Sequence, residues 1–562
     1  MGWTVWQVAR DLSAARASAT SIPSALGRGS ASARETAITL REHAAAARDR
    51  TSGPTWQVLE ALPGLGDDFD ATARASRAVD LIAREGVQPL VSSGLSASTF
   101  APRNGRIPVT QIAQASQPIT DAGVGFRRAR AELEPIRLEG LSREVRPDVE
   151  ALMREVDEGV RTLDEAARAA RVLPAMLGAD GRRTFLLVFQ NNAEPRSLGG
   201  MPGLMAPLRT DEGRVSIGAA VPASSFGDLD RPVLPLTAEE RRIWDDQPGT
   251  WFQDAVFIPD FARASELMAA RYEMESGTVV DGVVSVDPIS ISYLMEATGA
   301  VQVEGRRLTS DNFVDEILHR PYVRYRDDRR AEDAFFASVL EAVFDRVLGT
   351  QVRAPALVAA LSRGAEEGRL MVHLFDESAQ QELAGTRVAG GFPHGTGGPA
   401  QAGVYVNDAT GSKMGYYLDY DARVSSVSCA GGVIGFRGQL RIHSTAPRDA
   451  ARLPMTVTGP GTYGVERGDH LSVFDLVAPS GGEISEVVVN GVASRGTNRT
   501  YEGRPVVSIP ILLRPGDVVT VTWRATSGTG HTAGVEFVST PGVHHGGARV
   551  FVPAPCGEVE TR

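Results

Sequence analysis

The apolar pattern of this 562-residue chain changes twice, and the three resulting regions constrain its fold more than any single motif does. Over residues 1–175, apolar residues recur at three- and four-residue spacing between charges, as in REVRPDVEALMREVDEGV. This spacing is typical of amphipathic helices, and Pro54 and Pro63 mark breaks between them. We therefore expect an N-terminal helical stalk or hairpin bundle.

Short apolar runs such as RTFLLVF, VVDGVVSV and LMVHLF follow from residue 180 and alternate with helical stretches. That alternation predicts an α/β domain over residues 180–383. Residues 384–402 are rich in glycine and proline, which predicts a linker. Residues 403–562 hold eight strand patterns separated by turn residues, which favours a β-sandwich of immunoglobulin-like size. The predicted fold class is thus multidomain α+β.

The charge and cysteine content exclude some classes of function. The net charge is −11, so we expect no nucleic-acid binding driven by phosphate neutralisation. All but one of the 58 basic residues are arginines, the exception being Lys413, and this bias indicates GC-rich coding. Cys429 and Cys556 have no CxxC spacing that would indicate zinc. In an oxidising compartment they would form a disulfide that fastens the C-terminal tail; in the cytosol they would be two thiols.

The sequence contains neither an apolar run of roughly 18 residues nor a signal-peptide pattern. Trp3 and Trp6, however, stand ahead of a polar helical pattern, where an interfacial aromatic belt would follow a membrane span. Two readings stay open. Either the two tryptophans pack on a helix face, or a membrane anchor lies upstream of the sequence.

The segment FLLVFQNNAEPRSLGGMPG, residues 185–203, has the form of a buried strand that delivers polar groups to one turn. Amides and arginine can orient a phosphate or sugar, a carboxylate can hold a metal or act as a base, and glycines let backbone approach a ligand. The alternative is a turn whose side chains satisfy loop backbone. The candidate residues are Asn191, Asn192, Glu194, Arg196, Gly199 and Gly200.

A second candidate is the densest positive segment of this acidic chain, LHRPYVRYRDDRRAEDAFF. Guanidinium groups bind phosphate through paired hydrogen bonds, and tyrosines can lie under sugars or lipid. The alternative is a solvated helix start with internal ion pairs. The segment contains Arg320, Arg324, Arg326, Arg329 and Arg330, interleaved with Tyr322, Tyr325, Asp327 and Asp328.

Two aspartates in TVVDGVVSVDP form a third candidate. Asp281 and Asp287 are six residues apart on a strand pattern, so their side chains are expected on the same face, where carboxylate oxygens could hold a divalent cation. For Asp287 the structural alternative is favoured, because an aspartate followed by Pro288 is typical of a helix N-cap.

The strand-end segment and VVDGVVSVDPISISYLMEATGAVQV resemble a bacterial family known as domain of unknown function four-thousand-twelve. The resemblance extends to PTWQVLEALPGLGDDFDA and through LTSDNFVDEILHRPYVRYRDDRRAEDAFFASVLEAVF. It implies a single-pass envelope protein with an N-terminal anchor and an extracytoplasmic body.

The central region, from VFIPDFARASELMAARYEMESGTVVDGVV to ILHRPYVRYRDDRRAEDAFFASVLEAV, is distantly similar to the LytR–CpsA–Psr family. That family transfers glycopolymers from a polyprenyl-pyrophosphate carrier to peptidoglycan, with arginines on the pyrophosphate and usually Mg²⁺. By position, Arg320 or Arg324 matches its first arginine segment. Asp327 or Asp328 matches the aspartate that follows, and Arg329 or Arg330 the next arginine. The family's Ser-x-Pro-Arg-Asp strand end is absent, and Glu332 and Asp333 stand near its Arg-Gln pair.

Two functional hypotheses follow. In the first, an anchored extracytoplasmic envelope protein binds or transfers a polyprenyl-pyrophosphate-linked lipid or glycopolymer. Arg196, Arg320, Arg324, Arg329 and Arg330 would grip the pyrophosphate beside Asn191, Asn192, Gly199 and Gly200, with Glu194 and Asp327 in catalytic roles and Asp281 as a candidate metal ligand. In the second, the chain is a non-enzymatic surface protein that keeps the fold without the transferase activity.

Overall fold

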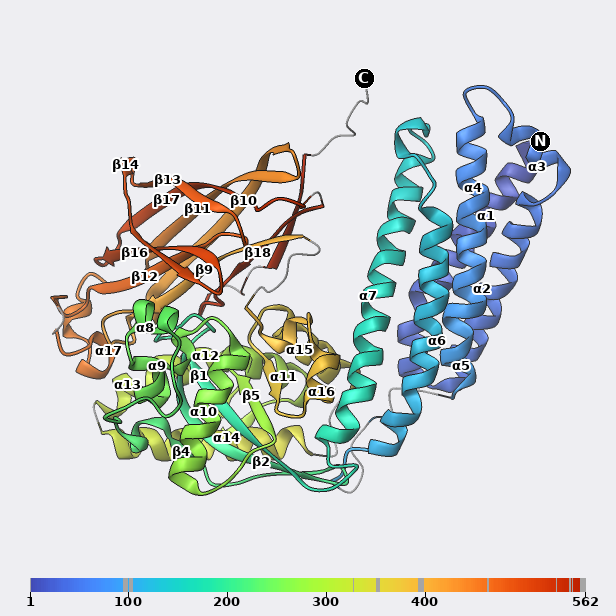
Figure 1. Ribbon diagram of the computed structural model, residues 1–562. Helices are drawn as coiled ribbons and strands as arrows, with labels where there is room; N and C mark the ends of the chain where they lie inside the picture. The colour runs from blue at the N-terminus through green and yellow to red at the C-terminus, as the bar shows by residue number, and fades with distance from the viewer. Residues whose placement is uncertain are drawn as a thin grey trace. The chain divides into compact units, whose positions relative to one another are not determined.

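The structure, a computed structural model, describes residues 2–94, 100, 105–326, 328–349, 354–392, 399–461, 464–531, 533–544, 547 and 549–555. It contains both helices and several sheets, which confirms the mixed α and β composition expected from the sequence (Figure 1). Two compact units are present. The first comprises Met1–Arg182 with Thr210–Val215, and the second comprises Arg183–Arg209 with Ser216–Arg562.

The first unit is a helical bundle with a core of small side chains. Leu40 and alanines such as Ala33, Ala44 and Ala78 are fully buried, so the helix backbones approach closely. The ring of Phe126 fills the space beside Gly159, where an added Cβ would lie 2.3 Å from it. The helices are α1 (Gly2–Arg28), α2 (Ser30–Thr51), α3 (Pro54–Glu60), α4 (Gly66–Leu81), α5 (Gln88–Ser92), α6 (Val109–Leu133) and α7 (Arg146–Met176), with a π-helical turn, η1 (Ile82–Val87), between α4 and α5 and a 3-10 turn, η3 (Leu138–Gly140), between α6 and α7.

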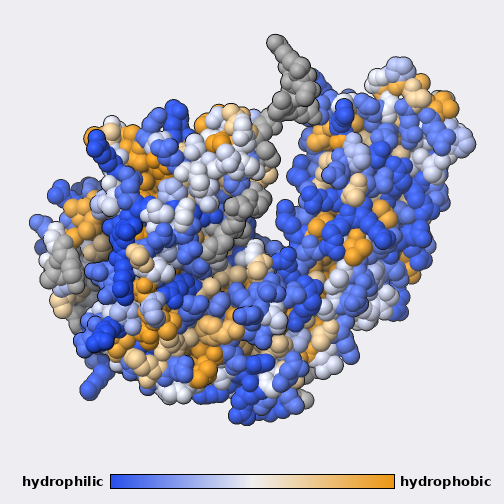
Figure 2. Space-filling model, viewed as in Figure 1, coloured by the Kyte–Doolittle hydropathy of each residue, from blue (hydrophilic) through white to orange (hydrophobic). Residues whose placement is uncertain are grey.

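The face of this bundle seen in Figure 2 is mostly hydrophilic, with apolar residues interspersed. The large apolar side chains that the bundle exposes include Trp6 on α1 and Val58, Leu62 and Leu65 in and after α3. The side chain of Trp3 is not among those described. Within the described residues, no helix is both long enough and apolar enough to cross a bilayer.

A mixed sheet with the strand order β3-β2-β1-β5-β8 lies mainly in the second unit, and β4 also pairs with β2. Strands β1 and β5 run parallel, whereas β5 and β8 are antiparallel. The strands are β1 (Arg183–Asn191), β2 (Met201–Asp211), β3 (Arg214–Ile217), β4 (Val221–Pro222), β5 (Gly282–Val286) and β8 (Met371–Leu374). A separate hairpin joins β6 (Val301–Val303) to β7 (Arg306–Leu308).

Helices pack against both faces of this sheet. Leu186 and Val283 meet α10 on one face, and Phe189 and Val286 meet α11 and α14 on the other. The helices of this unit are α8 (Ala238–Trp244), α9 (Gln247–Thr250), α10 (Phe261–Ser276), α11 (Pro288–Thr298), α12 (Phe313–Leu318), α13 (Arg320–Tyr325), α14 (Arg329–Val347), α15 (Ala354–Glu366), α16 (Glu377–Leu383) and α17 (Met455–Thr458). Its 3-10 turns are η4 (Ala223–Phe226), η5 (Phe252–Phe257), η6 (Arg387–Ala389), η7 (Met414–Tyr417) and η8 (Ala450–Arg452).

The rest of the second unit, from Ala400 to Pro553, is a two-sheet region whose sheets share one core. One sheet has the order β10-β11-β17-β13-β14 and the other β15-β16-β12-β9-β18-β19. All eight strand patterns of the sequence are strands here. The strands are β9 (Ala400–Asp408), β10 (Leu418–Ala430), β11 (Val433–Ser444), β12 (His470–Val477), β13 (Glu483–Val489), β14 (Val492–Ala493), β15 (Thr497–Tyr501), β16 (Arg504–Leu513), β17 (Val518–Thr526), β18 (Gly534–Ser539) and β19 (Arg549–Pro553).

The interval 384–402, expected to be a linker, is not simply an extended connection where it is described. Arg387–Ala389 forms η6, and Phe392 is 2% exposed in a core that includes residues of α10 together with Tyr405 and Tyr501 of the two-sheet region. The α/β part and the two-sheet region therefore share buried side chains. Cys429 lies on β10, whereas Cys556 is outside the described residues, so the disulfide remains a prediction.

Candidate functional site

The turn after β1 carries the strand-end residues, and it is buried. Residues 190–200 are all buried, because the turn packs onto the end of β9. The backbone NH of Asp408 donates to the carbonyl of Pro195 at 2.9 Å, and the backbone NH of Ser197 donates to the side chain of Asn407 at 2.9 Å. The strand-end segment thus forms a junction between the α/β part and the two-sheet region.

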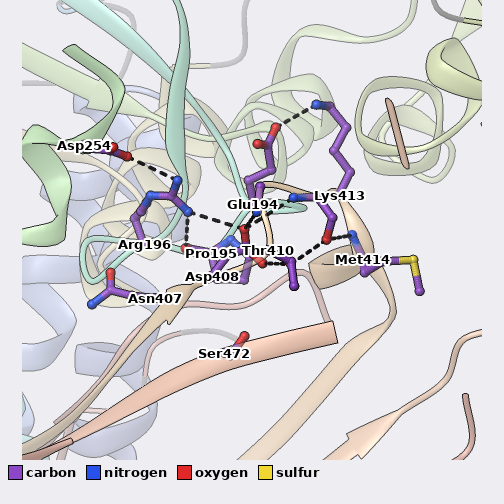
Figure 3. A network of polar contacts seen from close by, with 12 residues as sticks. Glu194, Pro195, Arg196, Asp254, Asn407, Asp408, Thr410, Lys413, Met414 and Ser472 are labelled. Atoms are coloured by element: carbon purple, nitrogen blue, oxygen red, sulfur yellow. Dashed lines mark hydrogen bonds and ion pairs between the residues drawn. The ribbon is translucent and has the colours of Figure 1, made fainter. Parts of the chain in front are cut away.

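The side chain of Arg196 is buried inside this junction and contacts partners there (Figure 3). Its guanidinium donates to Asp254 at 3.2 Å, lies 3.9 Å from Asp408, and stacks 4.5 Å from the ring centre of Phe257. Its side chain is 7% exposed. Burial raises the pKa of Asp254, and Arg196 opposes that rise. Arg196 is therefore an internal counter-ion and is not on the surface where a headgroup would bind.

Glu194 pairs with the chain's single lysine, which the sequence analysis did not select. The ammonium of Lys413 lies 2.7 Å from the Glu194 carboxylate and 4.7 Å from the ring centre of Tyr322. Burial alone would lower the pKa of Lys413, but Glu194, together with Tyr322 and Glu332, outweighs burial, so the pKa is raised. Lys413 is therefore charged, and it joins the strand-end turn to the arginine-rich segment that contains Tyr322. The one signal in the sequence was its uniqueness among 58 basic residues.

The two asparagines also have structural partners. Asn191 donates to the hydroxyl of Tyr322 at 3.0 Å, and Asn192 donates to Asp287 at 3.0 Å. Asp287 caps α11 and is followed by Pro288, which confirms the N-cap interpretation. It also accepts a hydrogen bond of 2.7 Å from Arg369, a guanidinium that is 1% exposed. Arg369 reaches Glu367 at 2.7 Å and the carbonyl of Gly542 at 2.8 Å.

The glycine pair closes the turn. A Cβ on Gly200 would lie 2.4 Å from the carbonyl carbon of Asn191, and one on Gly199 would lie 2.7 Å from the side-chain oxygen of Gln190. Gly199 also has a φ of +120°, which favours glycine. The space that we expected a ligand to occupy is therefore filled by the chain itself.

Asp281 lies just before β5 and has two partners. Its carboxylate accepts from the backbone NH of Thr184 at 2.7 Å and from Arg183 at 3.0 Å. Across the described residues, no group of three or more histidines, cysteines or acids is arranged to hold a metal ion. The Mg²⁺ assignment and the ligand role of Asp281 remain predictions.

The arginine-rich segment divides into two parts. Arg320 and Arg324 on α13 line a surface cavity of about 460 Å³ together with Asp315, His319, Val323 and Tyr416. Arg329 and Arg330 begin α14, are exposed, and do not line this cavity. Asp327 is outside the described residues, and Asp328 is the N-cap of α14, accepting from the backbone NH of Ala331 at 3.2 Å.

Ion pairs organise the wall of this cavity, which we call the α13 pocket. Arg324 donates to Glu316 at 2.8 Å, while its Nη1 atom is buried without a hydrogen-bond partner among the described residues. Arg320 contacts Asp315 and donates to Glu316 at 3.2 Å. Arg320 keeps 57% of its side chain exposed. Both guanidinium groups are thus oriented by carboxylates and retain donors.

The aromatic side of the pocket comes from the two-sheet region. The ring of Tyr416 stacks on His319 with centroids 4.7 Å apart, and its hydroxyl donates to Asp315 at 3.0 Å. The hydroxyl of Tyr417 lies 2.8 Å from the His319 Nε2 atom. Burial lowers the pKa of His319, and Asp315 opposes that change. His319 is therefore neutral in the folded protein over a wider pH range than free histidine.

A buried Ser472, His470 and Asp408 set in the two-sheet region superficially suggests a catalytic triad. Both contacts, at 3.1 Å to Ser472 and 3.2 Å to Asp408, involve the same Nε2 atom of His470. A relay needs the base on one ring nitrogen and the carboxylate on the other. All three side chains are also buried, so this set is structural.

The first hypothesis requires Glu194, Arg196, Arg324 and Arg329 to meet at one site, and this convergence is not observed. Glu194 and Arg196 lie in the buried junction, Arg324 lines the α13 pocket, and Arg329 is exposed on α14. The two segments are instead connected through Tyr322, which contacts both Asn191 and Lys413.

The fold and site define a mixed helix-and-sheet protein with a buried polar junction and a surface pocket whose two arginines pair with carboxylates. Residues 180–322 match the model of the family described as Protein of unknown function (DUF4012), which supports the resemblance to that family over these residues. The matched interval covers β1, the strand-end turn and the first half of α13, up to Tyr322. No curated protein sequence matches this chain.

Proposed function

We propose that this chain is an extracytoplasmic, membrane-anchored envelope protein whose α13 pocket binds the pyrophosphate of a polyprenyl-linked lipid or glycopolymer. The observation that carries the proposal is that Arg320 and Arg324 line one cavity of about 460 Å³ with Tyr416. Pockets of this size hold small ligands, and guanidinium groups bind phosphate through paired hydrogen bonds. The aromatic wall suits the apolar face of a sugar or of the first isoprene unit.

The proposal assigns binding and no transfer step. Glu194 is held by Lys413, and Arg196 by Asp254, in the buried junction, so these residues support the fold. The LytR–CpsA–Psr-like fold of the α/β part belongs to the same proposal and is supported by the parallel pair of β1 and β5 with helices on both faces. The second candidate, a surface protein without this ligand, is favoured by the carboxylates that already pair with Arg320 and Arg324.

The test is calorimetric titration of the full chain with inorganic pyrophosphate, and with undecaprenyl pyrophosphate in detergent. The Arg320→Ala/Arg324→Ala variant is expected to lose binding. The matched control is Arg329→Ala/Arg330→Ala, which removes the same charge from the same segment but outside the pocket. Equal loss in both variants would show a diffuse charge effect, and no binding by the wild type would favour the second candidate.

A further inference from the structure

Lys413, the chain's single lysine, lies in a confined space between two partners. It lies on the segment 409–417, between β9 and β10, and only 17% of its side chain is exposed. Its ammonium is placed between the Glu194 carboxylate and the face of Tyr322. A guanidinium is planar and wider than an ammonium, so the two cations are not interchangeable in such a confined space.

The segment that carries Lys413 also builds the pocket. The backbone NH of Tyr416 donates to the carbonyl of Lys413 at 3.1 Å, so the two residues share one turn. The backbone NH of Lys413 donates to Val457 at 2.9 Å, and Met414, the next residue, is 1% exposed. A displacement of Lys413 is therefore expected to displace Tyr416 as well, because backbone hydrogen bonds hold both residues in one short turn.

The other contact of Lys413 fixes the opposite wall of the pocket. Tyr322 stands on α13 between Arg320 and Arg324, the two arginines that line the cavity. The Lys413 ammonium lies over the ring of Tyr322, and the Tyr322 hydroxyl accepts a hydrogen bond of 3.0 Å from Asn191. The Lys413 ammonium thus contacts α13, the helix that carries the two arginines. Lys413 itself belongs to the segment between β9 and β10 that carries Tyr416.

We infer that Lys413 is the positioning residue of the α13 pocket, holding Tyr416 against α13 so that aromatic and basic walls face one ligand. This inference rests on the proposed function of the pocket. It assigns to Glu194, the expected catalytic carboxylate, the task of anchoring Lys413. Lys413 does not touch the ligand, and its effect passes through Tyr322 and Tyr416.

Binding of inorganic pyrophosphate to the full chain tests this inference in a double-variant cycle. Lys413→Arg and Lys413→Met are each expected to weaken binding on the order of tenfold, and to have little further effect when Tyr416→Ala is already present. Glu194→Gln, which releases the ammonium without changing Lys413, gives a second route if the lysine variants unfold. Arg437→Met, an exposed change on β11, is the control and should bind as the wild type does.

A measurement without ligand separates this inference from the proposed function. The chain has ten tyrosines, and ¹⁹F NMR of 3-fluorotyrosine protein, assigned with Tyr416→Phe, reports the surroundings of Tyr416. A shifted Tyr416 resonance in Lys413→Arg supports the positioning role even if the wild type fails to bind pyrophosphate. An unchanged resonance, or losses that simply multiply in the cycle, would overturn it.

Discussion

The ammonium of Lys413 and the carboxylate of Glu194 lie 2.7 Å apart at the junction between the two-sheet region and the turn after β1. Only 7% of the Glu194 side chain is exposed, so removing its partner leaves a buried charge unpaired. Such a loss is expensive because a buried carboxylate cannot recover its hydration. The same pair therefore affects stability as well as the pocket.

Replacing Lys413 with methionine is expected to lower the free energy of unfolding by about 2–3 kcal/mol, below the usual value for a fully buried pair because Lys413 keeps some exposure. Urea denaturation measures this change. The double variant Lys413→Met/Glu194→Gln removes both charges and should recover part of the loss. A double variant less stable than the single one would contradict the buried-charge explanation.

Arg369 should contribute more to stability than the surface arginine beside it. Arg369 is 1% exposed and joins Asp287, Glu367 and Gly542, so Arg369→Met is expected to cost about 3–5 kcal/mol. Arg363 pairs with the same Glu367 but is 53% exposed, and Arg363→Met should cost about 1 kcal/mol or less. If the two variants unfold at the same midpoint urea concentration, burial does not determine how much each arginine contributes to stability.

Gly200 should tolerate no side chain, since a Cβ there would lie 2.4 Å from backbone of Asn191. Gly200→Ala is expected to cost about 3 kcal/mol through overpacking of the turn. Gly391→Ala, where no atom lies within 4 Å of the added Cβ, is the control and should stay within about 0.5 kcal/mol of the wild type. Thermal unfolding measures the stability of both variants. A large loss in Gly200→Ala indicates a turn closed by the chain itself, and a loss as small as in the control would indicate open space that a ligand could occupy.

The stability of the fold should fall as pH decreases below about 6.5, and His319 should account for part of the fall. Burial lowers its pKa in the folded protein, so the unfolded chain takes up the proton first and is favoured at lower pH. The titratable groups that face it are Asp315, Arg320, Tyr416 and Tyr417, and His319→Gln changes none of them. The slope between pH 7 and pH 5 should be smaller in this variant, by no more than about 1.4 kcal/mol per pH unit. An identical slope would contradict the assignment.

Local patterns in the sequence predicted the elements well, because apolar periodicity and turn residues act within a few residues of each other. Asp287 followed by Pro288 predicted the start of α11, and the eight strand patterns after residue 403 predicted strands of the two-sheet region. The sequence did not predict which side chains contact each other across the fold. Glu194 meets Lys413, and Arg196 meets Asp254 and Asp408, only because distant segments pack together, and no local spacing reports that contact.

The predicted convergence failed for the same reason. A strand that ends in polar residues looks the same whether those residues face a ligand or another part of the chain. Here the two-sheet region covers the turn, and the pocket forms instead at α13. Of the predicted site residues, Arg320 and Arg324 line the pocket. Tyr416 was missed because it belongs to a different region of the chain.

The most direct test of the account is a crystal structure of the full chain grown with saturating inorganic pyrophosphate. We predict density for two phosphorus atoms in the α13 pocket, within hydrogen-bond distance of Arg320 and Arg324 and beside Tyr416. Density at Arg329 and Arg330 instead, or an α13 pocket that holds only solvent at saturating pyrophosphate, would contradict the proposed function.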